Sequence, residues 1–101
     1  MLSAAMLLLS AQSADWPLTR AERSNYQETS TYEDVIAFLK DLEARGAPMK
    51  LTFIGKSNEG RDAPLMIVSD PPVKNAVEAR AAGKAIVYVQ GNIHAGEVEG
   101  K

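Results

Sequence analysis

The spacing of apolar residues predicts one clear helix in the first half of the chain. Two capping-box registers fit its start, Ser30 with Glu33 and Thr31 with Asp34. The pattern predicts a helix over residues 31–45, which ends before Gly46. Its apolar positions recur at the i, i+3, i+4 and i+7 spacing of an amphipathic helix, at Tyr32, Val35, Ile36, Leu39 and Leu42.

Two short β-rich runs follow, "KLTFIGKS" at 50–57 and "APLMIVS" at 63–69. Residues 65–68 are continuously apolar, which is typical of a strand buried on both faces. The connection "NEGRD" has about five residues and contains Gly60, as hairpin loops commonly do. We therefore expect an antiparallel pair of strands.

A second group of elements is predicted further along the chain. "AVEARAAG" at 76–83 indicates a short helix, "KAIVYVQ" at 84–90 a strand, and the residues from Glu97 onward a further helix. Helices alternating with apolar strands favour a layered α/β domain with a mixed sheet, and the hairpin argues against an all-parallel barrel. Three strands followed by the start of a helix make an incomplete layer. We therefore expect an α/β domain that is partial, and incomplete at its C-terminus.

The first residues resemble an export signal. Residues 2–9 form a short apolar run, no charged side chain precedes Asp15, and small residues suited to signal peptidase follow. The run is far shorter than the roughly 20 residues of a membrane span. We expect residues 1–13 to be a signal peptide and the protein to be exported, periplasmic or secreted; the alternative is a disordered start. The polar residues 14–30, interrupted by Pro17, predict an extended arm.

Composition narrows the possible chemistry. Hydrophobic residues make up 46% and charged residues 24% of the chain, the net charge is -2, and the pI is near 5.3. This balance leaves no excess of basic residues of the kind that binds nucleic acid. Cysteine is absent, which excludes disulfides, thiolate nucleophiles and Cys-type structural zinc sites. A bound metal would need nitrogen and oxygen ligands, which are typical of catalytic zinc.

One candidate metal pair follows the predicted strand 84–90. His94 is the chain's one histidine, and Glu97 can reach the same side of a tight turn three residues later. Imidazole and carboxylate both suit zinc, and ligand sites in open α/β sheets form beyond the carboxyl ends of strands. The alternative is a surface histidine paired with a helix-starting glutamate. Glu99 and Lys101 are expected to be solvated charges.

Several ordered motifs together resemble the start of the catalytic domain of zinc carboxypeptidases, a metallopeptidase family. These are "TSTYEDVIAFLKDLEARG", "GKSNEGRDAPLMIVS" and "KAIVYVQGNIHAGEVEGK". The resemblance as a whole covers about residues 16–101. The resemblance implies that His94 and Glu97 are the first two ligands of a Zn²⁺ ion. It also implies that residues 31–101 are the N-terminal part of the catalytic domain and that peptide or protein C-termini are the substrate.

The resemblance also bears on the roles of two further positions. Arg61 matches the arginine of the family's E-G-R turn, which makes it a candidate for substrate binding; a hairpin arginine that fixes the loop or pairs with a nearby carboxylate is the favoured interpretation. Gly96 stands where pancreatic-type members carry a substrate-touching arginine. Their subsite preferences are therefore not expected here.

The resemblance implies that the family's remaining functional residues would lie beyond Lys101. They include a second zinc-binding histidine and a general-base glutamate, so we expect the 101 residues alone to be inactive and to hold no catalytic residue. The leading hypothesis is a zinc metallocarboxypeptidase. The alternatives are a zinc amide hydrolase acting on acylated amino acids or cell-wall peptides, and a non-catalytic binding domain of the same fold. We expect neither a nucleic-acid partner nor a stable membrane span, and the sequence leaves the oligomeric state open.

Overall fold

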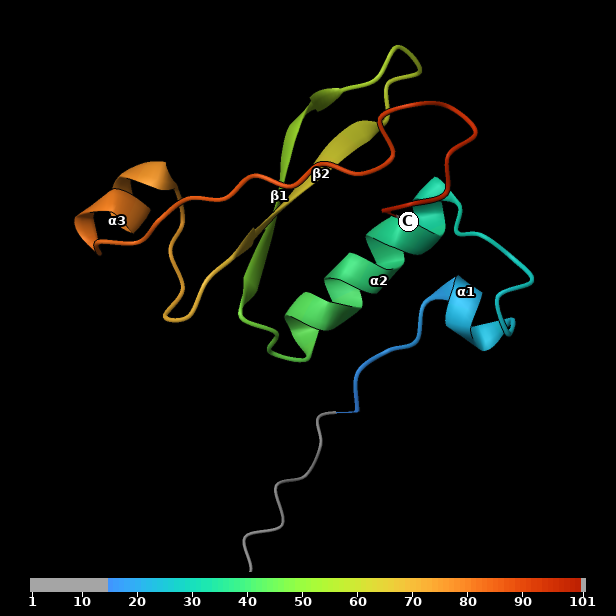
Figure 1. Cartoon of the computed structure of the whole chain (residues 1–101), viewed down its shortest axis with the longest axis horizontal. Helices are drawn as coiled ribbons and strands as arrows, with labels where there is room; N and C mark the ends of the chain where they lie inside the picture. The colour runs from blue at the N-terminus through green and yellow to red at the C-terminus, as the bar shows by residue number, and fades with distance from the viewer. Residues whose placement is uncertain (1–14, 101) are drawn as a thin grey trace, which may run out of the picture.

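The computed structural model describes residues 15–100, a small α/β arrangement of three helices and one two-stranded sheet (Figure 1). The predicted leader, residues 1–13, lies outside the described residues. No helix among residues 15–100 is long and apolar enough to cross a membrane. In chain order the elements are α1 Arg20–Arg23, α2 Tyr32–Ala44, β1 Met49–Lys56, β2 Asp62–Val68 and α3 Ala76–Ala81.

Helix α2 confirms the amphipathic helix that the sequence predicts. Of the two capping registers, the structure uses Thr31 with Asp34. The Thr31 hydroxyl accepts a hydrogen bond from the Asp34 backbone N–H at 3.2 Å, and the Asp34 carboxylate accepts one from the Thr31 N–H at 2.8 Å. The helix ends at Ala44 and is followed, after its cap Arg45, by a left-handed Gly46 with φ of 83°, a conformation that costs glycine little.

Strands β1 and β2 form the expected antiparallel hairpin. Their register runs from Met49 opposite Val68 to Phe53 opposite Pro64, and after an irregularity Lys56 pairs with Asp62. The loop closes through a hydrogen bond from the Ser57 N–H to the Arg61 carbonyl, at 2.8 Å. The hairpin predicted by the "NEGRD" connection is therefore confirmed.

Helix α2 packs against this hairpin, and the small core lies between them (Figure 1). Leu39 from α2 and Leu51 from β1 are both buried. Polar contacts join the same elements: the Glu43 carboxylate accepts a hydrogen bond from the Leu51 N–H at 3.1 Å, and the Tyr32 hydroxyl donates to the Asp62 carbonyl at 2.9 Å. One packed unit of α2, β1 and β2 results.

The prediction that residues 65–68 are buried on both faces is wrong. Met66 is 43% exposed and Val68 is 67% exposed. Within the described residues, α2 is the main helix packed on the hairpin, and a single helix cannot cover both faces of a sheet.

The predicted strand at 84–90 is also absent from the described structure. Its residues are without regular structure, and the backbone N–H groups of 85–93 donate no backbone hydrogen bond to any described residue. An apolar run favours an extended chain, but a strand exists only when a neighbouring strand pairs with it. The described sheet is therefore antiparallel, with the order β1-β2, and not mixed.

The structure differs from the predictions at both ends of the described residues. A one-turn helix, α1, interrupts the segment predicted to be an extended arm, because Thr19 and Glu22 form a second capping box. No helix begins near Glu97; residues 94–97 form a turn instead. Helix α3, in contrast, forms where predicted, capped by Asn75.

Candidate metal centre

The structure brings His94 and Glu97 together on one exposed turn. The Glu97 N–H donates to the His94 carbonyl oxygen at 3.4 Å, which closes the turn. The imidazole Nδ1 of His94 lies 3.0 Å from the Oε1 atom of Glu97, and the His94 backbone N–H donates to the Oε2 atom at 3.3 Å. Both carboxylate oxygens of Glu97 therefore face His94.

Backbone conformation explains how three residues bring these side chains to the same side. Gly96 has a φ of 87°, a left-handed conformation that an L side chain adopts only at a cost. Gly96 is thus the residue that lets this turn close tightly between the two candidate ligands.

The charge state of the Glu97 carboxyl group also suits metal binding. The pKa of Glu97 is lowered, first by hydrogen bonding with the Glu99 side chain and then by hydrogen bonds from His94. A lowered pKa keeps the carboxyl group ionised, and a metal ligand must be deprotonated.

The two donor atoms fit a zinc ion in type and spacing. Ligands about 2.0–2.2 Å from a tetrahedral zinc lie roughly 3.3–3.6 Å apart, so a separation of 3.0 Å needs to open by only a few tenths of an ångström. The His94 side chain is 76% exposed and that of Glu97 39%, which leaves room for further ligands. Among residues 15–100 no group of three or more metal-ligating side chains occurs, so the described residues supply two donors.

Arg61 lies at the end of the hairpin loop and contacts its own surroundings. Its guanidinium group pairs with the Glu59 carboxylate and sits 5.9 Å from the centre of the Tyr32 ring. These contacts tie the loop to the start of α2. Within the described residues it makes no hydrogen bond or ion pair with His94 or Glu97. The substrate contact implied for Arg61 stays a prediction.

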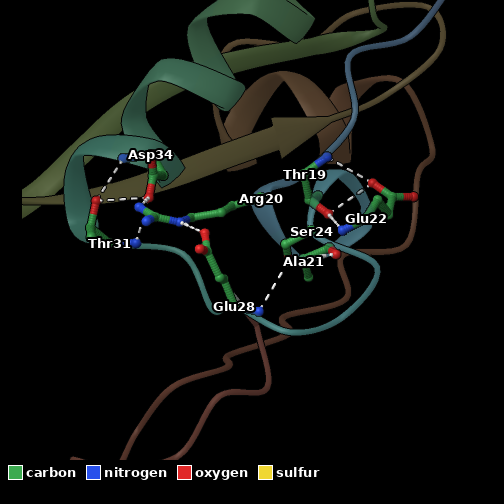
Figure 2. Close-up of polar contacts among 8 residues, drawn as sticks. All are labelled: Thr19, Arg20, Ala21, Glu22, Ser24, Glu28, Thr31 and Asp34. Atoms are coloured by element: carbon green, nitrogen blue, oxygen red, sulfur yellow. Dashed lines mark hydrogen bonds and ion pairs between the residues drawn. The ribbon is translucent and has the colours of Figure 1, made fainter.

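A second polar cluster, which the sequence did not predict, joins α1 to α2 (Figure 2). The guanidinium of Arg20 bridges the carboxylates of Glu28, at 2.8 Å, and Asp34, at 2.9 Å. Hydrogen bonds from the Thr31 backbone and then from Arg20 lower the pKa of Asp34 to about 2. The cluster anchors the N-terminal segment on the first turn of α2, and all its charges are paired with one another.

Comparison with known proteins identifies a family for this chain. Residues 35–101 match the sequence profile of the family described as zinc carboxypeptidase. Neither the curated proteins nor the solved structures compared with the chain gave a match. The matched region covers more than half of the 101 residues and includes His94 and Glu97. The chain therefore belongs to the zinc carboxypeptidase family.

Proposed function

We propose that His94 and Glu97 are two zinc ligands of a metallocarboxypeptidase that hydrolyses the C-terminal bond of peptides or proteins. One observation carries this proposal: inside the family match, Nδ1 of His94 and Oε1 of Glu97 lie 3.0 Å apart on an exposed turn. The pairing combines the nitrogen and oxygen donors that catalytic zinc sites use.

The residues of the turn have distinct roles in this proposal. When bound, zinc lowers the pKa of a coordinated water towards 7 and polarises the scissile carbonyl. The contact between Nδ1 and Oε1 would then give way to two metal bonds. The His94 backbone N–H would keep its hydrogen bond to Oε2 and so hold the Glu97 carboxylate in orientation.

We also propose a structural role for the unpaired residues 84–90 in the complete domain. Four consecutive side chains of this run are large, apolar and exposed: Ile86, Val87, Tyr88 and Val89. Their backbone N–H groups pair with no described backbone group. Because an extended apolar run with free backbone groups is stabilised by a neighbouring strand, we place it within the mixed sheet of a layered α/β domain.

Zinc content of the full-length protein tests the ligand assignment. His94→Ala and Glu97→Gln are each expected to abolish stoichiometric zinc, measured by atomic emission after dialysis. Glu33→Gln is the matched control, since it neutralises an exposed carboxylate of α2 that accepts no hydrogen bond among the described residues, and it should retain the metal. Undiminished zinc in His94→Ala would contradict the assignment.

Substrate assays test the proposed reaction. Release of the last residue from a peptide with a free C-terminus is expected, and amidation of that terminus should abolish it. Turnover of acylated amino acids alone would favour the zinc amide hydrolase. Peptide binding without turnover in the zinc-loaded protein would favour the binding domain.

A further inference from the structure

The segment that carries the candidate ligands is closed by contact between two glycines. A Cβ atom placed on Gly91 would lie 2.8 Å from the Cα of Gly100 and 3.4 Å from the carbonyl oxygen of Glu99. A Cβ placed on Gly100 would in turn lie 2.8 Å from the Cα of Gly91. The neighbouring atoms are backbone atoms, which cannot rotate away as a side chain can. Neither position therefore accepts a side chain while the contact is kept.

This requirement differs from that of the other glycines in the described chain. Gly46, Gly60, Gly83 and Gly96 have positive φ angles, but a Cβ atom on any of them would meet nothing within 4 Å. Those positions need glycine for conformation alone. Gly91 does not have a left-handed φ, so its requirement for glycine is purely one of space, whereas Gly100, with φ of 82°, needs glycine for both space and conformation.

We propose that Gly91 and Gly100 are positioning residues that close residues 91–100 into a loop and hold the His94–Glu97 turn ready for zinc. This inference rests on the proposed function, since it concerns the same metal site. With the loop ends in contact, less conformational freedom is lost when the metal binds. Without the contact, the two ligands would have to be ordered at the moment of binding.

Gly91→Ala in the full-length protein is the sharpest test, because alanine tolerates this backbone conformation and only the contact with Gly100 is disturbed. Competition with a chelator should show about 10-fold weaker zinc affinity, the lower end of the effect of losing a residue that orients a metal ligand. The unfolding midpoint of the apo-protein should stay unchanged. Gly60→Ala is the control: it strains a left-handed glycine in the hairpin loop and should leave zinc affinity as in the parent protein.

A second readout needs no metal. A Glu-specific protease can cleave after Glu97 and Glu99, and the apo-form of Gly91→Ala should be cut faster there than the parent apo-protein. Gly100→Ala disturbs the same contact from the other side and also strains a left-handed glycine, with φ of 82°, so its apo-form should be cut faster as well. Unchanged zinc affinity and unchanged cleavage in both variants would overturn the proposal. If zinc binds the parent protein and Glu97→Gln equally, the metal-site assignment fails, while faster cleavage would still show that the glycines close the loop.

Discussion

The packed unit of α2, β1 and β2 and the segment from residue 84 to residue 100 are stabilised in different ways. The first has a buried pair, Leu39 and Leu51, and backbone hydrogen bonds throughout its strands and helix. The second leaves its apolar side chains exposed and its extended backbone unpaired, yet it carries both candidate metal ligands.

This difference separates the source of stability from the source of chemistry. The packed unit depends on local capping and on the burial of apolar surface. The ligand turn depends on glycines, on short polar contacts and, in our proposal, on bound zinc. A change in one region should therefore leave the defining property of the other intact, which gives three predictions.

The largest effect is expected from removing a core side chain. Leu39→Ala in the full-length protein should lower the free energy of unfolding by about 2–5 kcal/mol, since the side chain is buried between α2 and the hairpin. Denaturant titration measures this loss. Zinc stoichiometry of the folded variant should remain that of the parent. Lys40→Ala, an exposed neighbour on the same helix, should change stability by less than about 0.5 kcal/mol.

Hydrogen exchange compares the two regions directly. In the polypeptide of residues 1–101, the paired N–H groups of β1 and β2 should exchange about 100-fold more slowly than those of residues 85–93, which donate no backbone hydrogen bond to a described residue. In the full-length protein, the proposed strand at 84–90 should become protected as well. Equal protection of both regions in the shorter polypeptide would remove the contrast.

The smallest effect concerns the acid that caps α2. The pKa of Asp34 falls from its ordinary 3.8 to about 2, mainly because its carboxylate accepts a hydrogen bond from the Thr31 backbone. A lowered folded-state pKa stabilises the fold fully above the ordinary value, and this stabilisation is lost as the pH falls towards 2.

Urea titration of the apo-protein between pH 5 and pH 2 tests this linkage. The stability difference between the parent and Asp34→Asn should shrink as the pH falls. Glu33→Gln is the control, because the neighbouring Glu33 accepts no hydrogen bond among the described residues. A difference that stays constant across the range would show that Asp34 contributes no pH-dependent stability.

Local signals in the sequence predict the packed unit well. The helical spacing of Val35, Leu39 and Leu42 and the turn around Gly60 act over a few residues, and α2 and the hairpin form where they indicate. The sequence could not choose between Ser30 and Thr31 as the cap, because both offer a hydroxyl and an acid three residues on. It also did not predict the bridge from Arg20 to Asp34, which spans fourteen residues.

The prediction of a strand at 84–90 was wrong for a different reason. Its composition reports a tendency to be extended and buried, whereas a strand also needs a partner, and no described strand pairs with it. The spacing of His94 and Glu97 was sufficient to suggest a shared turn. It could not show that Gly91 meets Gly100, since this contact depends on the path of the loop.

Crystals of the full-length protein measured at the zinc absorption edge would test the central claim most directly. Our account predicts an anomalous peak about 2.0–2.2 Å from one imidazole nitrogen of His94 and from a carboxylate oxygen of Glu97. A zinc peak coordinated by other residues, with His94 and Glu97 still paired only with each other, would contradict it.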